Sequence, residues 1–353
     1  MNSAIVNQAA WVVAEKAHPM EVRRGPTPAP NANEVVIKVI YAAVNPTDYK
    51  MQFEPYFQME YPFVFGTDVS GIVFQIGSNV TKFKIGQRVI GHCDSLMTRK
   101  STNAGFQLYS TCREGLVSAV PDNVPLSNAA VLPLAVDTAA GALFLKLGLP
   151  LPSLNPKQTT STILIWGGAS SVGSCAIQLA VAAGLRVITT ASKSNFDYVR
   201  ALGASQTFDY HDEDSVKQIK NTLKIGDKVV DCIGLASTQG KCADILHAIG
   251  GGDLPVVLWP QGDFPEDVQP RLVNGLATGF TSDELGSWGP GAAEIGQALW
   301  HDYIPKALAE GHFQAKPDPF VIEGGLAKVQ EAVDMLRNGV SAKKIVIEVQ
   351  AES

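Results

Sequence analysis

The stretch ILIWGGASSVGSCAIQLAVAAG, residues 163–184, is the part of this sequence that decides the expected fold. An apolar run typical of a buried strand leads into glycine and serine, and a helical segment follows, which we expect over Ser174 to Ala183. Because a helix N-terminus exposes backbone N–H groups and carries a partial positive charge, this corner predicts an anion-binding site. The alternative is an ordinary turn between a strand and a helix.

The glycine spacing of this corner points to a dinucleotide. Gly168 and Gly173 stand at the first and third positions of the pattern GxGxxG, and Ser170 takes the middle one. The predicted strand, loop, helix and second strand follow in the order of a dinucleotide-binding unit. The expected cofactor contacts are Gly168, Ala169, Ser170, Ser171, Val172, Gly173, Ile233 and Leu258.

Outward from this corner, short apolar strands alternate with helices. Strands are expected at 185–192, 228–234 and 255–260, with a helix near Phe196 to Leu202. This alternation predicts an α/β fold with a Rossmann-type, doubly wound parallel sheet, which we place in residues 128–287.

The first third of the chain has a different pattern, rich in strands and turns. Strands are expected at 34–44, 68–77 and 85–91, and the last stretch ends in a strand at 343–349. A chain of 353 residues exceeds the size of most single cores. We therefore expect a second, β-rich substrate domain that is discontinuous, built from residues 1–127 and 288–353.

The residues after the second Rossmann strand indicate the choice of cofactor. An NAD-specific site places an acid about 20 residues after the glycine loop, but the chain has Ser192, Lys193 and Asn195 there. Hydroxyl, amide and ammonium groups suit a 2'-phosphate, and Tyr210 is a further expected contact. The prediction is NADPH; the alternative is that Lys193 is an ordinary solvated lysine.

Composition excludes several classes of partner. The net charge is −6 and the basic residues are scattered, so we expect no nucleic-acid binding. The five cysteines are widely spaced without a CxxC pair, which indicates reduced thiols. The N-terminus lacks a signal-peptide pattern, and the apolar segment from Ala129 to Leu145 is shorter than a membrane span. We expect a cytoplasmic protein without a membrane partner.

Several motifs along nearly the whole chain resemble the medium-chain dehydrogenase/reductase superfamily, in particular its zinc-free quinone oxidoreductase and enoyl reductase branches. They are NPTDYK (45–50), FGTDVSGIVFQIGSNVTKFKIGQRVIG (65–91), GFQLYS (105–110), LPLAVDTAAGALF (132–144), GGASSVGSCAIQLA (167–180) and VSAKKIVIEV (340–349). GLPLPSLNPK, ITTASKSNFDYVRALGAS and ALAEGHFQAKP are closer still to fungal CipB-like proteins and trans-acting polyketide enoyl reductases. The resemblance implies that the β-rich domain is GroES-like and that the protein belongs to fungal secondary metabolism.

The resemblance also implies the site residues. Lys50 and Thr138 correspond to residues that line the catalytic cleft beside the nicotinamide ribose, and Asn45 is the third candidate. Asn45 also suits helix capping before Pro46, Lys50 could be merely solvated, and Thr138 could bond a backbone carbonyl within its helix. Asp137 stands where a small residue is expected.

No metal is expected. Zinc-dependent members of the superfamily carry Cys where this chain has Asn45 and a His-Glu pair where it has Thr67 and Asp68. Two of these three positions therefore hold side chains that are not usual zinc ligands.

The predicted activity is hydride transfer from NADPH to an activated C=C bond of a small unsaturated substrate, an enone or an enoyl thioester, free or on a carrier protein. Lys50 and Thr138 would stabilise the charge that develops on the carbonyl oxygen. The alternatives are a quinone reductase, a zinc-free ketone or aldehyde reductase, and a non-catalytic NADPH-binding scaffold protein. The chain is expected to be a monomer, or a homodimer paired through an edge of the nucleotide sheet near residues 272–283.

Overall fold

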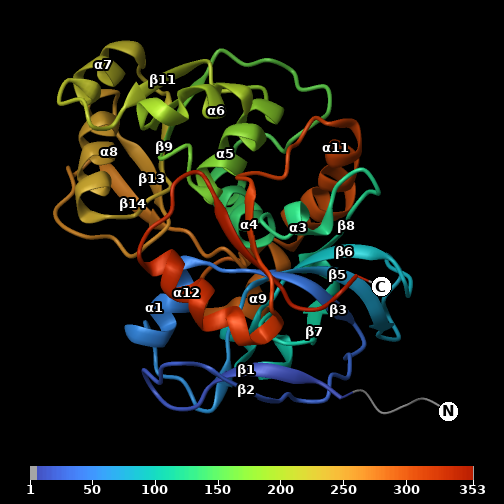
Figure 1. The fold of residues 1–353 in the computed structure, drawn as a ribbon. Coiled ribbons are helices and arrows are strands. Elements are labelled where there is room, and N and C mark those ends of the chain that lie inside the picture. The colour runs from blue at the N-terminus through green and yellow to red at the C-terminus, as the bar shows by residue number, and fades with distance from the viewer. Residues whose placement is uncertain (1–5, 353) are drawn as a thin grey trace. The chain divides into compact units, whose positions relative to one another are not determined.

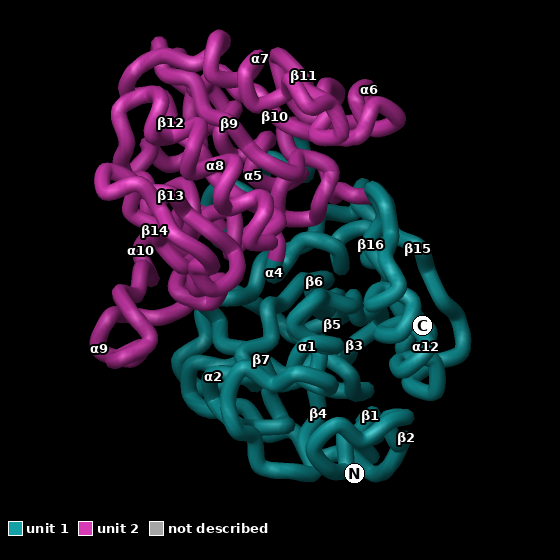
Figure 2. The backbone as a smooth tube through the Cα atoms, turned by 90° about the vertical axis from the view of Figure 1, so that its left-hand side faces the viewer, with its two compact units in different colours: residues 1–134, 300–311, 318–353 teal, residues 135–299, 312–317 magenta. Residues whose placement is uncertain are grey.

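The computed structural model describes residues 6–352, which form two compact units (Figures 1 and 2). Unit 1 holds the chain up to Leu134, Trp300–Gly311 and the residues from Asp318 onward. Unit 2 holds Ala135–Leu299 and His312–Pro317. The changes from one unit to the other come several residues after the expected boundaries at 127 and 287, and the short return of 312–317 to unit 2 was not expected.

Unit 2 contains a six-stranded parallel sheet with the strand order β11-β10-β9-β12-β13-β14. The strands are β9 (Thr162–Trp166), β10 (Arg186–Ala191), β11 (Gln206–Asp209), β12 (Lys228–Asp231), β13 (Gly252–Val256) and β14 (Val268–Leu272). The helices between them are α5 (Ser171–Ala182), α6 (Phe196–Ala201), α7 (Ser215–Thr222) and α8 (Ala236–Ala248). The chain starts in the middle of the sheet and winds outward in both directions, which confirms the predicted Rossmann-type fold.

Two elements of unit 2 differ from their expected bounds. Helix α5 begins three residues earlier than expected, because Ser170 caps it and Gly173 is accommodated inside its first turn. Strand β13 runs over 252–256 instead of 255–260, since its pairing with β14 begins at Gly252. The apolar letters beyond the strand were misleading: Trp259 is exposed in a loop.

Unit 1 is built on a seven-stranded sheet in the order β15-β16-β3-β5-β6-β8, with β7 also paired to β3. Its strands are β3 (Glu34–Ala43), β5 (Asp68–Ile76), β6 (Arg88–His92), β7 (Tyr109–Arg113), β8 (Val117–Ala119), β15 (Pro319–Ile322) and β16 (Lys344–Glu348). A three-stranded sheet holds β1 (Gln8–Val12), β2 (Glu21–Arg24) and β4 (Phe63–Val64). The antiparallel pairing of β16 with β3 joins the end of the chain to the sheet of its first third.

The helices of unit 1 include two that pack against each other, α1 and α12 (Figure 1). The helices are α1 (Pro46–Phe53), α2 (Ser95–Thr98), α3 (Leu126–Ala129), α11 (Ile304–Glu310) and α12 (Val329–Arg337). Buried Val, Ile, Phe and Met side chains of both sheets and of α12 form the core of this unit.

The apolar helical run Leu126–Lys146 is longer than expected. It consists of α3, α4 (Pro133–Ala140) and a π-helical segment, Gly141–Lys146. By length and composition it is the one helix among the described residues that could cross a membrane, but 83% of its apolar window is buried inside the protein. The expectation that it is too short was wrong, while its burial is that of a core helix. The remaining helices of unit 2 are α9 (Ser282–Leu285), α10 (Ala293–Gly296) and a π-helical segment from Gln297 that ends in unit 1 at Tyr303.

Candidate active site

The glycine corner after β9 is tightly packed. Gly167 has a φ of +85°, a left-handed conformation that favours glycine. A Cβ atom on Gly168 would lie 2.2 Å from the hydroxyl oxygen of Thr189, and one on Gly173 would lie 2.2 Å from the carbonyl oxygen of Gly167. Gly168 and Gly173 were predicted from the sequence pattern, whereas Gly167, the residue that makes the turn, was not.

The first turn of α5 presents free donors. The Ser170 hydroxyl caps the helix, accepting from the Gly173 N–H at 3.0 Å and donating to the Gly167 carbonyl at 2.8 Å. Within the described chain, the N–H groups of Ser171 and Val172 have no hydrogen-bond acceptor, and both residues are partly exposed. Two open donors at the N-terminus of a twelve-residue helix suit a diphosphate.

Two apolar side chains of unit 2, Ile233 and Leu258, lie close to the turns that follow β9 and β12. A Cβ on Gly167 would come within 2.5 Å of Ile233, and one on Gly234 would come within 2.8 Å of Leu258. The buried carboxylate of Asp231 fixes the turn after β12, accepting from the N–H groups of Ile233 at 2.9 Å and Gly234 at 3.2 Å. Burial raises the pKa of Asp231. This positioning role was missed, although an acid that ends an apolar strand was a readable signal.

The polar residues after β10 form one group. The Ser192 hydroxyl accepts from the Asn195 amide at 3.1 Å and lies 3.1 Å from the Ser194 hydroxyl. The side chain of Lys193 is 80% exposed. The structure thus brings together the three residues expected to bind a 2'-phosphate.

The end of β10 carries no acid, as the sequence shows, but an acid from another strand lies beside this group. Strand β11 pairs with β10 so that Asp209 stands opposite Ala191, and the Asp209 carboxylate is 3.9 Å from the Lys193 ammonium. Tyr210 follows it, exposed, with its ring 4.2 Å from that of His211. This acid was not predicted because it comes from the third strand of the unit, β11, and not from the second.

Thr138 lies on α4 with its hydroxyl against Gly275, where an added Cβ would come within 2.7 Å. The residue is 7% exposed, and no hydrogen-bond partner of its hydroxyl is found in the described part of the chain. The alternative of a hydroxyl bonded to a backbone carbonyl is therefore not observed. Asp137 is fully buried and accepts a hydrogen bond from the Thr278 hydroxyl, which ties α4 to the segment after β14.

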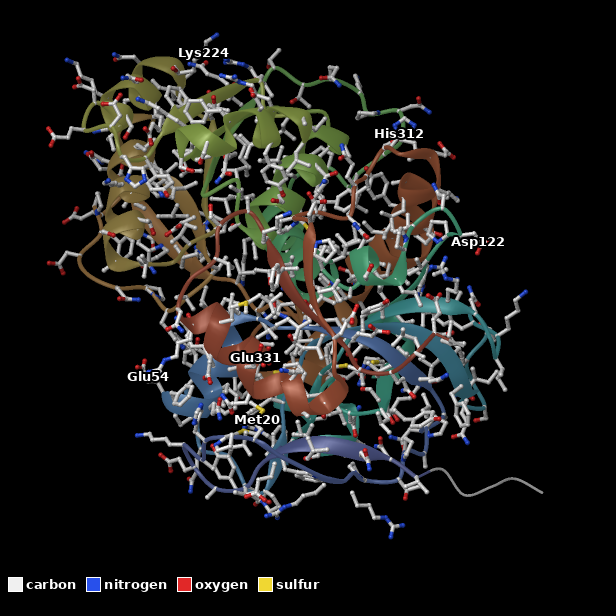
Figure 3. The ribbon with its side chains drawn as sticks, in the orientation of Figure 1. Met20, Glu54, Asp122, Lys224, His312 and Glu331 are labelled. Atoms are coloured by element: carbon white, nitrogen blue, oxygen red, sulfur yellow. The ribbon has the colours of Figure 1, made fainter. Side chains whose placement is uncertain are left out.

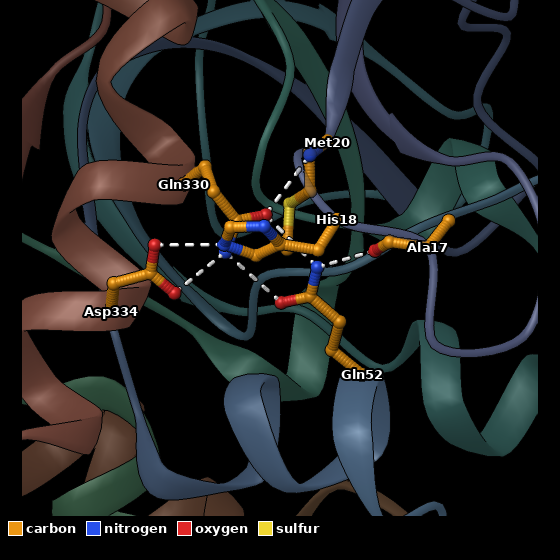
Figure 4. A network of polar contacts seen from close by, with 6 residues as sticks. All are labelled: Ala17, His18, Met20, Gln52, Gln330 and Asp334. Carbon is orange, nitrogen blue, oxygen red and sulfur yellow. Dashed lines mark hydrogen bonds and ion pairs between the residues drawn. The ribbon is translucent and has the colours of Figure 1, made fainter.

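Lys50 is the fifth of the eight residues of the short helix α1 and is partly exposed. Among the described residues its ammonium has no ion-pair partner. The end of α1 is fixed by Gln52, whose amide donates to the Ala17 carbonyl at 2.7 Å and to Gln330 of α12 at 2.9 Å (Figure 4). Met20, labelled in Figures 3 and 4, donates its backbone N–H to Gln330 Oε1 at 2.9 Å.

The beginning of α1 rests on a buried polar cluster, which we call the Lys344 cluster: Asn45, Thr67, Asp68 and Lys344. The Asn45 amide donates to the Thr67 hydroxyl and to Asp68 Oδ2, each at 2.8 Å. Its Oδ1 accepts from the Lys344 ammonium, which lies 3.2 Å from Asp68 Oδ2. The side chain of Asn45 is thus fully engaged within unit 1. Lys344 was not predicted, because in the sequence it is one of two adjacent lysines at the start of the closing strand.

Asp48, inside α1, completes this corner of unit 1. Its carboxylate accepts from the N–H groups of Asn45 at 2.7 Å and Gly66 at 3.2 Å. Burial, reinforced by the charge of Asp68, raises the pKa of Asp48 to about 7. The carboxyl group thus caps the helix and titrates near neutrality.

The chemistry of the Lys344 cluster does not suit zinc. Asp68 is its one usual zinc ligand, and an ammonium lies where a second cation would be repelled. Within residues 6–352, no group of three or more His, Cys, Asp or Glu side chains could hold a metal ion. That the protein works without zinc stays a prediction, tested below.

Together, the doubly wound sheet, the glycine corner and the second β-rich unit define a dinucleotide-dependent oxidoreductase. The family described as "Alcohol dehydrogenase GroES-like domain" matches residues 31–122, and that described as "Zinc-binding dehydrogenase" matches residues 171–288. The chain belongs to the medium-chain dehydrogenase/reductase family, whose members use a nicotinamide cofactor.

Full-length relatives agree with this assignment. The trans-enoyl reductase himH of Aspergillus japonicus is 58% identical over 98% of both chains. The "zinc-binding alcohol dehydrogenase domain-containing protein cipB" of Emericella nidulans is 36% identical over 98% of this chain and 99% of its own. An alcohol dehydrogenase superfamily protein from Novosphingobium aromaticivorans has a solved structure with a TM-score of 0.77 and 25% identity, covering 98% of this chain and all of its own. The predicted resemblance is confirmed.

Proposed function

We propose that this protein is an NADPH-dependent reductase that transfers hydride to the activated C=C bond of an enone or an enoyl thioester. The observation that carries the proposal is the similarity to himH, a trans-enoyl reductase, along nearly the entire chain. Because that similarity includes both units, the substrate-binding and the cofactor-binding halves are compared together.

The glycine corner supports the cofactor part of the proposal. Ser171 and Val172 offer two backbone donors, and the close packing at Gly168 and Gly173 holds the start of α5 against the loop that presents them. Ile233 and Leu258 would contact the nicotinamide end through their apolar side chains. Bound nicotinamide supplies the hydride, and the protein's own groups bind and orient the reactants and stabilise the developing charge.

Lys50 and Thr138 are the proposed catalytic residues. Reduction of a conjugated C=C bond places negative charge on the carbonyl oxygen, and donors already in position stabilise that charge. Each side chain keeps a hydrogen-bond donor that no neighbour in the described chain uses. In this proposal Asn45 holds the start of α1 through the Lys344 cluster and does not contact the substrate.

The choice of NADPH is supported by Ser192, Lys193 and Asn195 and opposed by Asp209, whose carboxylate would repel a phosphate. We propose that Lys193 turns from Asp209 to the 2'-phosphate when the cofactor binds, because an ion pair at 3.9 Å between an exposed lysine and a carboxylate is weak. We also propose that the enzyme works in the cytoplasm, as a monomer or homodimer, on a substrate that is free or attached to a carrier protein.

The test is a product assay with NADPH and with NADH on three acceptors: an enone, an enoyl thioester and a quinone. We expect NADPH oxidation with the first two, a saturated product that keeps its carbonyl group, and a preference for NADPH. An alcohol that keeps its double bond would instead show a carbonyl reductase. Oxidation with the quinone alone would show a quinone reductase, and binding of NADPH without oxidation would leave a scaffold protein.

A further inference from the structure

Lys344 is unusual among the lysines of this protein because its side chain is only 3% exposed. Its ammonium contacts Asn45 Oδ1 and lies 3.2 Å from Asp68 Oδ2, and the Asp68 carboxylate is fully buried. Buried lysines are rare unless paired, since burying a charge without a partner is costly. Lys344 and Asp68 form such a buried pair, and both contact the Asn45 amide. Solubility of the protein surface does not explain charges in this position.

Strand pairing brings Lys344, Asp68 and Asn45 together from distant parts of the sequence. Strand β16 begins at Lys344 and is antiparallel to β3, while β3 pairs with β5 so that Ala43 stands opposite Asp68. Asn45 follows β3 by two residues, and the Val44 N–H donates to the Ile345 carbonyl at 3.0 Å. Three neighbouring strands thus converge at one end of the sheet.

Two helices begin on this cluster. Asn45 is the residue before α1, the helix that carries Lys50. The other oxygen of Asp68, Oδ1, accepts from the backbone N–H of Leu134 at 2.7 Å. Leu134 is the second residue of α4, the helix that carries Thr138. The starts of α1 and α4 therefore lie at groups that the Lys344 ammonium contacts, and all of these groups belong to unit 1.

We propose that Lys344 is a positioning residue, a fixed buried cation that anchors α1 through Asn45 and α4 through Asp68. It takes the place of a metal ion at positions where zinc-dependent members of the superfamily carry ligands. The other members of the site are the Asn45 amide, the Thr67 hydroxyl and the Asp68 carboxylate. The Lys344 ammonium neutralises the carboxylate and donates to the amide oxygen, so that the buried acceptors have hydrogen-bond donors. The part of the inference that concerns catalysis rests on the proposed function; the anchoring does not.

The test compares two double variants. Removing Lys344 alone would leave Asp68 as an unpaired buried charge, which endangers folding. The variant Lys344→Met with Asp68→Asn removes both charges and keeps similar side-chain volumes. Its matched control is Lys220→Met with Asp244→Asn. This variant removes an ion pair of unit 2 in which the ammonium and the carboxylate are 2.7 Å apart and both side chains are accessible to solvent.

Three properties are measured on each folded variant: kcat with the best acceptor, the Kd of NADPH, and amide hydrogen exchange of peptides covering residues 45–53 and 133–140. For the Lys344 double variant we expect kcat to fall at least about tenfold, because small misplacements of catalytic groups are costly. The Kd of NADPH should change by less than about twofold, because the expected cofactor contacts lie on unit 2. Exchange should rise in both peptides, with little change in strands β1 and β2.

Unchanged exchange in the two peptides would overturn the anchoring, whatever the activity. Faster exchange together with an unchanged kcat would overturn the positioning role. If the wild-type protein reduces none of the acceptors, the proposed function fails, and the exchange data alone then decide whether Lys344 anchors the two helices. The control pair should leave all three properties as in the wild type.

Discussion

At the scale of single residues, Lys50 and Thr138 differ from other polar side chains of their own units. The side chains of Asn45, Asp137 and Ser170 form hydrogen bonds with neighbours in the same unit. Lys50 and Thr138 keep donors without a partner in the described chain, at modest exposure. Such donors are available to a substrate without first breaking an internal bond, which favours a catalytic role over a structural one.

Removing either donor should slow turnover. We expect Lys50→Met and Thr138→Val each to lower kcat about 100-fold, since one donor to a developing oxyanion contributes on that scale. The Kd of NADPH should stay nearly constant. Steady-state kinetics and a fluorescence titration check this, with Lys100→Met, an exposed lysine, as the control. Two variants with wild-type kcat would refute the assignment.

Cofactor choice should depend on the pairing of Lys193 with Asp209. We expect Lys193→Ala to weaken NADPH binding on the order of tenfold and to leave NADH binding unchanged, because only NADPH carries the phosphate. Asp209→Asn should tighten NADPH binding by removing a repulsive charge. Calorimetric titration with both cofactors measures this. Equal affinities of the wild type for NADPH and NADH would contradict the prediction.

At the scale of elements, the corner between β9 and α5 depends on how closely the helix approaches the loop. Gly173 packs against the backbone of Gly167 and Gly168, and Gly168 packs against the side chain of Thr189, so neither position has room for a side chain. Because the same backbone presents the free N–H groups of Ser171 and Val172, packing and anion binding are linked. A change that pushes the helix away should therefore affect both.

Gly173→Ala tests this link. Its Cβ would lie 2.2 Å from the Gly167 carbonyl oxygen, so the helix must move, and we expect a loss of stability together with at least about tenfold weaker NADPH binding. The matched control is Gly240→Ala in α8, where no atom lies within 4 Å of the added Cβ. There we expect a gain of about 0.5–1 kcal/mol. Thermal unfolding and a cofactor titration check both variants.

The start of α1 should make stability depend on pH. Because the pKa of Asp48 is about 7 in the folded protein and 3.8 without perturbation, folding favours its protonated form. Its contribution to stability is therefore present below pH 3.8 and is lost as pH rises through about 7. We expect the free energy of unfolding to fall less between about pH 5 and 8 in Asp48→Asn than in the wild type. Urea unfolding measures this; Glu213→Gln, an exposed site, should follow the wild type.

At the scale of the whole molecule, the chain combines a cofactor unit and a β-rich unit, and we predict that it works without a metal. The description "Zinc-binding dehydrogenase" of the matching family would suggest a metal. The donor set of the Lys344 cluster indicates the opposite, because an internal ammonium already neutralises Asp68.

Metal analysis of the purified protein should find less than about one zinc in ten chains, and treatment with a chelator should leave both activity and thermal stability unchanged. Zinc removal from a zinc-dependent member offers the positive control for the assay. One zinc per chain that resists dialysis, or inactivation by the chelator, would contradict the prediction.

The sequence by itself determined the cofactor unit, because its signals are local. Apolar strands, the glycine corner and the helix that follows lie within a short stretch, and each is specified by near neighbours along the chain. The positions of the corner, Gly168 to Gly173, and of the polar group at Ser192, Lys193 and Asn195 could be read for this reason, and their contacts with the cofactor stay a prediction. Element ends, such as those of α5 and β13, were less accurate because caps and strand partners set them.

Only the tertiary structure decided which distant charges meet. Lys344 reaches Asn45 and Asp68 because β16, β3 and β5 are neighbours in one sheet, and Asp209 reaches Lys193 because β11 pairs with β10. Pairing between strands far apart in sequence leaves no periodic pattern to read. A buried lysine and an exposed one look alike as letters, and the difference between a surface charge and an internal cation arises only when the sheet forms.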